Sequence, residues 1–350
     1  MNKINSLNIS GPTNIVRVEG SINGDNKVLY LFFDYHVKET KCSDYGSIDV
    51  IQLFDKFTKE AKSYNNEWDL FIEDDINYIK NKDVIDKTNY VNIYLEELRN
   101  FFNNKFSEKV NDVVKKKNNV RYHYFDLRWK INYFNIVNLI NEIINYNYNK
   151  ETLYSKINSI YDLILLDYDN IFKKDNKINS KFNNNNLRDV ILKILNECKK
   201  EFESLLKDFK VIISDIKNSS DKFLKKLTKD GFFYDYNYEI RTKLKKFNDS
   251  YMYLNSQITD LYFLRRFLDK KYIKNGVIYS GGYHSINIIL ILVKLLNFKI
   301  TNVSYSKIKL LTELNNYVKE ANYNLDLKKI LFPEYLIQCS SMKGFPDMFL

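Results

Sequence analysis

The chain has few cysteines and histidines, the residues that form disulfides and bind metal ions. Its 350 residues include only three cysteines, three prolines and three histidines, and alanine occurs only as Ala61 and Ala321. The cysteines Cys42, Cys198 and Cys339 are odd in number and show no CxxC spacing. We therefore expect reduced thiols in a cytosolic setting, and neither a disulfide framework nor a zinc knuckle.

The motifs of several large enzyme classes are also missing. The sequence has no GxxxxGK[ST], GxGxxG, GxSxG or HExxH motif and no kinase signature. These absences argue against P-loop nucleotide hydrolysis and against common zinc proteases. The chain does not begin with an apolar segment of signal-peptide type, and its longest apolar run, Ile286 to Leu296, is too short to span a bilayer. We expect a soluble protein that is not secreted and has no membrane span.

The charge of the chain is strongly positive. The formal net charge is +10 and the isoelectric point is about 9.0, which suits an anionic partner such as nucleic acid. The abundance of Asn, Lys and Ile beside two alanines is typical of an AT-rich genome, and codon usage of that kind raises the lysine content of any protein. The chain is rich in aromatic residues but shows no RNP-like motif, so a nucleic-acid partner has weak support.

Apolar patterns predict strands in the first third of the chain. Residues Asn14 to Ile22 and Lys27 to His36 flank a polar turn and predict a β-hairpin. The second run is apolar on both faces, as in a central strand covered on both sides. Two more short apolar runs, Trp68 to Asp75 and Val120 to Trp129, also predict strands.

Helical spacing dominates the rest. Helices are expected over Ser47 to Tyr64 and Asn89 to Val114, and over nearly all of Asn132 to Lys271. The chain then returns to strands at Gly276 to Tyr279 and Phe298 to Ser304. This order predicts an α/β protein with a mainly parallel sheet and a large helical insertion. Its parts would be residues 1–131, the insertion 132–271, and residues 272–350.

Polar residues collect where the predicted strands stop. They are Asp34, His36, Glu73, Asp126, Arg128, and the segment Gly281-Gly282-Tyr283-His284-Ser285. Ligand sites in open α/β sheets lie beyond the carboxyl ends of the strands, so these residues are expected to form one site. The pair Gly281 and Gly282 predicts a tight loop, with a positive φ or a close approach of the backbone, and His284 would lie in that loop.

Two chemistries are compatible with this set. His36, Glu73 and His284 could hold a divalent metal ion that activates water, or one histidine could act as a general base. Arg128 or Arg265 would then stabilise developing negative charge. Arg265 occupies an apolar position of its helix, so a structural ion pair is the alternative for it. His123 is a secondary candidate for the site, but it lies in mid-strand, which favours a structural role. Asp126 and Arg128 could form a simple salt bridge.

Two family resemblances appear at these residues. The blocks NIVRVEG, KVLYLFFDYH, DLYFLRRFLDK and VIYSGGYHS resemble those of uncharacterised proteins from giant DNA viruses. The resemblance implies a setting in the host cytoplasm of an infected cell or in the virion, with other viral proteins as partners. Gly281 to His284, Glu73 and His36 also resemble the pattern of erythromycin-esterase-like and TraB/Tiki-like α/β hydrolase-type proteins. Phe33 stands where that pattern has glycine.

The sequence thus supports a hydrolase-like site as the first hypothesis. The alternatives are a viral structural or interaction protein that keeps the fold without catalysis, and a basic protein that associates with nucleic acid.

Overall fold

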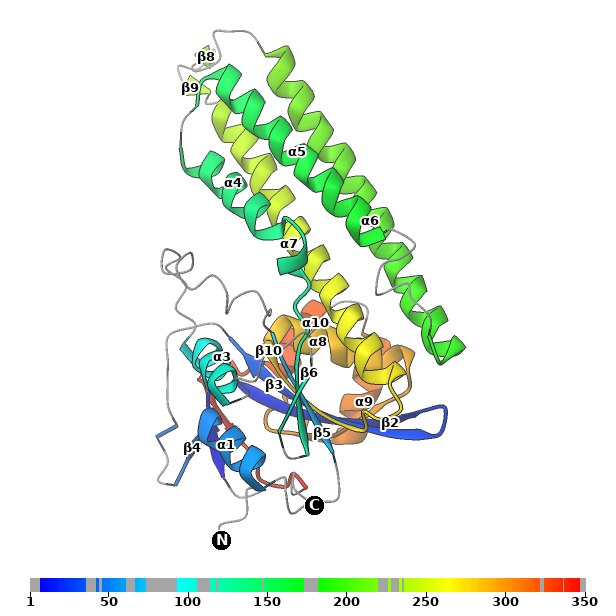
Figure 1. Cartoon of the computed structure of the whole chain (residues 1–350). Helices are drawn as coiled ribbons and strands as arrows, with labels where there is room; N and C mark the ends of the chain where they lie inside the picture. Colours follow the sequence, from blue (N-terminus) through cyan, green and yellow to red (C-terminus); the bar gives the residue numbers. More distant parts are fainter. Residues whose placement is uncertain are drawn as a thin grey trace. The chain divides into compact units, whose positions relative to one another are not determined.

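The computed structural model of the chain is shown in Figure 1. It describes residues 7–35, 42–43, 46–60, 67–73, 93–105, 114–117, 119–146, 148–172, 182–219, 226–227, 233–234, 236–321, 324–335 and 337–346. His36 lies outside the described residues.

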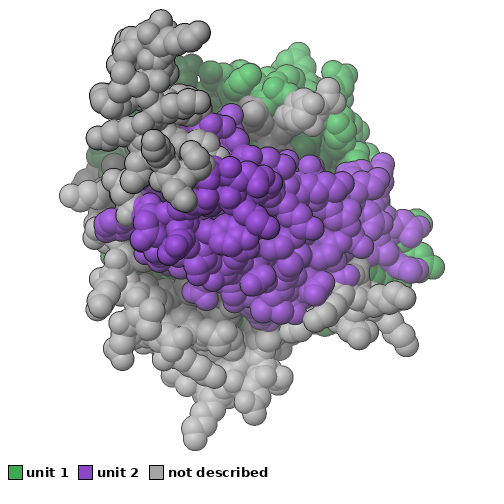
Figure 2. Space-filling model, turned by 90° about the horizontal axis from the view of Figure 1, so that it is seen from above, with its two compact units in different colours: residues 1–126, 182–187, 263–350 green, residues 127–181, 188–262 purple. Residues whose placement is uncertain are grey.

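The chain forms two compact units, coloured separately in Figure 2. The first, called the sheet unit here, comprises residues 1–126, 182–187 and 263–350. The second, the helical unit, comprises residues 127–181 and 188–262.

A seven-stranded sheet is the centre of the sheet unit. In spatial order its strands are β11 (Lys299–Val303), β2 (Asn14–Ile22), β3 (Asp25–Asp34), β10 (Asn275–Gly281), β5 (Trp68–Ile72), β7 (Val120–Tyr124) and β6 (Val114–Lys117). Strands β3, β10, β5 and β7 are parallel to their neighbours within this group, whereas β11–β2, β2–β3 and β6–β7 pair antiparallel. The sheet is therefore mixed: parallel pairing is limited to its centre, and a mainly parallel sheet is not confirmed.

The predicted hairpin is present. Strands β2 and β3 pair antiparallel from Asn14 opposite Phe33 to Ile22 opposite Asp25. The turn residues Asn23 and Gly24 have φ angles of 51° and 81°, the left-handed conformation that two-residue hairpin turns require. Beyond this turn β3 is buried from Tyr30 to Asp34, as expected for a central strand.

Helices cover both faces of the sheet (Figure 1). On one face α1 (Val50–Glu60) and α3 (Ile93–Lys105) enclose an aromatic core with side chains from β3, β5, β7 and β10. On the other face, α8 (Gly282–Leu290) packs on β3, and α10 (Asn324–Leu331) packs on α8. The end of α7 (Tyr236–Asp269) also lies on this face, where Phe263 and Phe267 contact Phe71 of β5. A π-helical turn, Ile291–Leu295, continues α8, and α9 (Leu311–Glu320) packs against it and against β11.

A second, smaller sheet corrects the expectation of reduced cysteines. Its strands are β12 (Cys339–Ser341), β1 (Asn8–Ser10) and β4 (Ile48–Asp49) in spatial order. Antiparallel pairing of β1 and β12 brings Cys339 beside Cys42, and the two form a disulfide across 297 residues of sequence. Spacing rules recognise only cysteines that are close in sequence, so they miss a pair that the tertiary fold brings together.

The helical unit consists mainly of long helices, within residues 127–181 and 188–262. Its elements are α4 (Tyr133–Asn145), α5 (Lys150–Phe172), α6 (Asn185–Asn218) from residue 188, α7 up to residue 262, and a short hairpin of β8 (Lys226–Leu227) and β9 (Phe233–Tyr234). The carboxyl of Asp167 is buried at its centre and accepts hydrogen bonds from the Asn132 amide and the Tyr251 hydroxyl. Burial raises the pKa of Asp167 despite these bonds. None of the helices in the described part of the chain combines the length and apolar composition needed to cross a bilayer.

Lys27 is buried, and its ammonium group caps the C-terminal end of α7. Its ammonium donates hydrogen bonds to the carbonyl oxygens of Phe267 at 3.3 Å and Lys270 at 2.7 Å, and also to that of Ile273. The last carbonyl groups of a helix have no partner within the helix, and a cation is favoured beside them. Lys27 thereby links the start of β3 to the segment that leads into β10.

We expect Lys27→Met to lower the free energy of unfolding of the sheet unit by about 2 kcal/mol, because the buried carbonyl groups lose a charged donor while the apolar stem is kept. Chemical denaturation at pH 7 measures this change. Lys299→Met at an exposed position of β11 is the matched control and should change stability by less than about 0.5 kcal/mol. Equal effects of the two substitutions would contradict the capping role of Lys27.

Candidate functional site

The four parallel strands bring their carboxyl ends to one edge of the sheet, as predicted. Strand β3 ends at Asp34, β10 at Gly281, and β5 is followed at once by Glu73. Beyond β7 come Phe125 and Asp126, both of which are buried. We call this region the carboxyl edge. It gathers residues from the first 126 positions and from the last third of the chain.

Glu73 and His284 meet at the carboxyl edge. The Glu73 Oε1 and His284 Nε2 atoms are 3.4 Å apart, and each residue is only 4% exposed. The edge of the Phe125 ring faces the imidazole of His284 in a T-shaped contact, with ring centroids 6.4 Å apart. The carboxylate of Glu73 and the imidazole of His284 are thus largely shielded from water, so the electrostatic interaction between them is stronger than it would be at the surface.

The backbone holds Glu73 in this position. The N–H of Gly281 donates to Glu73 Oε2 at 2.7 Å, across 208 residues of sequence. The Arg99 guanidinium donates to the Glu73 carbonyl at 2.7 Å, and the Glu73 N–H donates to the Tyr279 carbonyl at 3.3 Å. The carboxylate therefore lies at the N-terminus of α8, which favours negative charge.

The two glycines have different roles. Gly281 precedes α8 with φ −49° and ψ 141°, a conformation open to other residues, so a positive φ is not what Gly281 provides. The helix begins at Gly282 without an intervening loop, and His284 therefore lies in its first turn rather than in a loop. A Cβ atom on Gly282 would come within 2.1 Å of the Phe332 ring. The expected close approach exists, but a side chain makes it.

Asp34 lies at the same edge but binds another residue. The Tyr279 hydroxyl donates to Asp34 Oδ1 at 3.2 Å, and both residues are fully buried. The Tyr279 ring belongs to the core beneath α1 and α3, on the sheet face opposite to Phe71. Burial raises the pKa of Tyr279 well above its ordinary value. Tyr279 is therefore a neutral donor to Asp34.

His123 belongs to a separate cluster of buried charges away from the carboxyl ends. Its Nε2 lies 2.5 Å from Asp69 Oδ1, and its Nδ1 accepts a hydrogen bond from Arg266 Nε at 3.2 Å. Arg121 binds Asp69 through two nitrogens, at 2.7 and 2.6 Å. Burial by itself would raise the pKa of Asp69, but the hydrogen bonds from Arg121 and His123 outweigh it and the pKa is lowered. Both ring nitrogens of His123 are therefore engaged within this cluster.

The two arginines predicted for the site, Arg128 and Arg265, each lie over an aromatic ring. The Arg265 guanidinium lies over the Phe182 ring, 5.1 Å from its centroid. Its neighbour Arg266 is the residue that reaches His123. Arg128 belongs to the helical unit and lies over the Tyr133 ring at 5.5 Å. Charge stabilisation by Arg128 or Arg265 stays a prediction.

Sequence reasoning missed three polar residues of the sheet unit. They are Arg99, which binds the Glu73 backbone, Asp69 in the charge cluster, and Ser280, whose hydroxyl oxygen lies 3.2 Å from that of Ser285. Asp69 carried a signal, because it is a charge inside the apolar run WDLFI. Within the described ranges, no three His, Cys, Asp or Glu side chains gather closely enough to hold a metal ion. Glu73 and His284 are two of the three predicted ligands, and His36 lies outside those ranges.

Gly282→Ala should destabilise the sheet unit by about 2 kcal/mol, because the new methyl group meets the Phe332 ring and the core must shift. Combining it with Phe332→Leu, which removes the clashing ring atoms, should cost less than the sum of the two single changes. Denaturation of the four proteins of this double-mutant cycle measures the coupling. Strict additivity would show that Phe332 does not require the glycine.

Burial lowers the pKa of His123 below its ordinary value, although Asp69 opposes the shift. The folded protein then keeps His123 neutral, while the unfolded chain takes up a proton below about pH 6.5. We expect the free energy of unfolding to fall as the pH is lowered from about 7 to 5. Denaturation across this range should show a shallower dependence for His123→Gln. An unchanged slope would mean that His123 titrates alike in both states.

Comparison with known proteins places the chain among viral proteins. It is 30% identical to the uncharacterized protein R706 of Acanthamoeba polyphaga mimivirus, over 100% of this chain and 99% of that protein. The uncharacterized protein R161 of the same virus is 29% identical over 99% of this chain and 98% of its own length. No solved structure matches the chain significantly, and the esterase-like and TraB/Tiki-like resemblance finds no support. The model of DUF5847, a family of unknown function, matches residues 7–173 and 131–350, and the chain belongs to that family.

Proposed function

We propose that the carboxyl edge is a hydrolytic site in which His284 is the general base and Glu73 orients it. The observation that carries the proposal is the buried pair of Glu73 and His284 beyond the ends of parallel strands, with 3.4 Å between Oε1 and Nε2. Ligand sites of α/β sheets occur in this position. A histidine backed by a carboxylate is a common proton acceptor in hydrolysis.

The proposed mechanism uses both nitrogens of His284. We place the ring hydrogen on Nε2, which lies 3.4 Å from Glu73 Oε1, and the proposed mechanism then requires Nδ1 to take the proton of an attacking water molecule. Glu73 then stabilises the imidazolium that forms. Because the Gly281 N–H holds the other carboxylate oxygen at 2.7 Å, Glu73 can orient the ring without changing its own position.

The start of α8 would supply the electrophilic part of the site. His284 lies in the first turn of this helix, where backbone N–H groups have no acceptor within the helix. Oxygen atoms that become negative during attack of water on a carbonyl or phosphoryl group are stabilised by such donors. The proton acceptor and these donors thus come from one turn of the chain.

A metal-assisted form of the reaction would use Glu73 and His284 as two ligands and His36 as the third. A carboxylate and two imidazoles suit Zn²⁺ and similar ions, whose bound water is activated for attack. The setting that we propose for either form is the infected host cell or the virion, because the relatives are proteins of a virus.

A non-enzymatic interaction protein is the second candidate, and the burial of the site favours it. Glu73 and His284 are each 4% exposed, and both carboxylate oxygens of Glu73 face hydrogen-bond donors. A pair of this kind can also serve only to fasten β5 to the start of α8. The two candidates differ in what the loss of His284 does to a folded protein.

We expect the protein to hydrolyse members of a panel of chromogenic carboxylic and phosphate esters, and His284→Gln to lower kcat/KM at least about 100-fold by removing the base. Glu73→Gln should lower it as well, because the neutral amide no longer stabilises the imidazolium. His123→Gln is the matched control at a histidine outside the site and should keep its activity at temperatures where it is folded.

Metal analysis of the same proteins separates the two mechanisms. A stoichiometric metal that is lost in both His36→Ala and His284→Ala would establish the metal-assisted form. Hydrolysis without metal would establish the general base. No hydrolysis of any ester by folded wild-type protein, together with a large loss of stability in Glu73→Gln, would overturn the proposal in favour of the interaction protein.

A further inference from the structure

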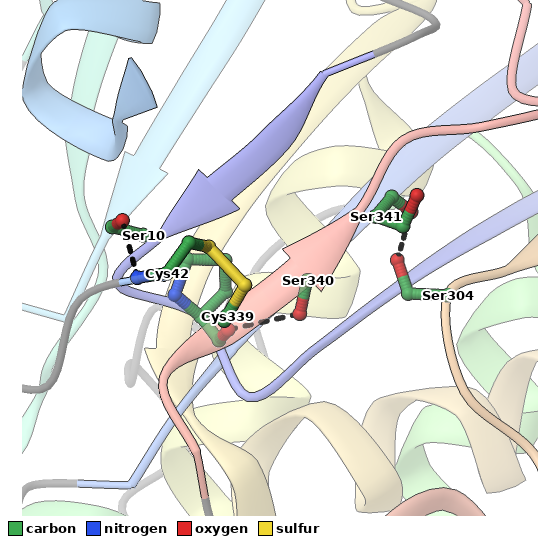
Figure 3. Close-up of a disulfide and its surroundings, with 7 residues drawn as sticks. Ser10, Cys42, Ser304, Cys339, Ser340 and Ser341 are labelled. Atoms are coloured by element: carbon green, nitrogen blue, oxygen red, sulfur yellow. Dashed lines mark hydrogen bonds between the residues drawn. A yellow bond between two sulfur atoms is a disulfide. The ribbon is translucent and has the colours of Figure 1, made fainter. Parts of the chain in front are cut away.

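The disulfide between Cys42 and Cys339 joins two distant parts of the sheet unit, as Figure 3 shows. The two Cα atoms are 5.1 Å apart. Cys339 is the first residue of β12 and lies opposite Ser10 of β1, while the Cys42 N–H donates to the Ser10 hydroxyl at 3.0 Å. The bond therefore fastens the chain beyond β3 to the edge of the small sheet.

Hydrogen bonds and core contacts also hold β12. The Gly11 N–H donates to the Gln338 carbonyl and the Met342 N–H to the Leu7 carbonyl, each at 2.9 Å, and the Met342 side chain is buried in the core.

The strands of the small sheet contain three, three and two residues, which is short even for an edge ladder. The Ser340 hydroxyl donates to the Pro12 carbonyl at 2.9 Å, and the Ser304 hydroxyl donates to the Ser341 carbonyl. Because these strands are short, the covalent link between Cys42 and Cys339 is expected to add to the stability of this sheet.

The small sheet is also fastened to the carboxyl edge. The segment that follows β1 reaches Thr13, whose N–H and hydroxyl both donate to the Phe33 carbonyl, at 2.8 and 3.2 Å. Phe33 directly precedes Asp34, where β3 ends. Loosening of β1 and β12 would therefore reach the end of β3 through a short run of hydrogen bonds.

The three cysteines differ in their access to reagents. Cys42 and Cys339 are partly exposed, so thiols and disulfides in solution can reach them. Cys198 is buried in the helical unit, and burial raises the pKa of its thiol to about 12. Since the thiolate is the reactive form, Cys198 is inert while the protein is folded.

We propose that Cys42 and Cys339 form a reversible redox latch on the sheet unit, closed by a disulfide oxidant of low molecular weight or on a partner protein. The thiolate of one cysteine attacks the disulfide of the oxidant, forms a mixed disulfide and releases one thiolate. The second cysteine attacks the mixed disulfide, forms the Cys42–Cys339 bond and releases the other. The two cysteines lose two protons and two electrons, and the oxidant leaves as two thiols. Closure holds β12 on β1, and reduction releases it. The latch does not depend on the proposed hydrolysis.

The test begins with full-length protein purified under reductant and then treated with oxidised glutathione. We expect one cross-linked peptide that contains Cys42 and Cys339, and one titratable thiol after denaturation instead of three. The melting temperature of the sheet unit should rise by on the order of 5 °C. Amide hydrogen exchange should slow at residues 7–13 and 339–345, because the small sheet is then held closed.

Cysteine variants show whether the effect belongs to this bond. Cys198→Ser should respond to reductant as the wild type does, whereas Cys42→Ser and Cys339→Ser should each behave as reduced protein and ignore reductant. Three free thiols after oxidation would overturn the proposal. So would a bond whose reduction changes neither the melting temperature nor the hydrogen exchange of the wild-type protein, a comparison that needs no variant to fold.

Discussion

The sheet unit depends on strand β10, which pairs in parallel with β3 on one side and with β5 on the other. Residues 275–281 thereby form the strand between β3 and β5 in a sheet whose other central strands come from the first 124 residues of the chain. The pairing also brings the start of α8 beside Glu73, which directly follows β5. This pairing of β10 with β5 is what brings Glu73 and His284 together.

Two carboxylates, those of Asp69 and Glu73, are buried on the same face of this sheet. Asp69, Phe71 and Glu73 alternate with apolar residues along β5 and its end, so they share the face covered by α7 and α8. Asp69 binds the side chains of Arg121 and His123, whereas Glu73 binds a backbone N–H and meets His284. Asp69 thus has compensating charge close by, whereas Glu73 lies at the N-terminus of α8.

The predictions that succeeded rest on local pattern. The alternation of Asn14 to Ile22 and the polar turn after it gave the hairpin with correct bounds for its first strand. The apolar runs also located the strand ends beside which Glu73 and His284 lie. Predictions failed where partners are distant in sequence, as for Cys42 and Cys339, or where packing decides, as for Gly282 against Phe332.

The sequence by itself determined the longer strands and helices, because burial periodicity is a local property of the chain, but it did not indicate short strands such as β1, β6 and β12. It also determined that polar residues collect at strand ends. Only the tertiary structure decided that β10 lies between β3 and β5, that His123 is engaged by Asp69 and Arg266 while His284 faces Glu73, and that two of three cysteines pair. These are consequences of long-range pairing, for which no fixed spacing in the sequence provides a signal.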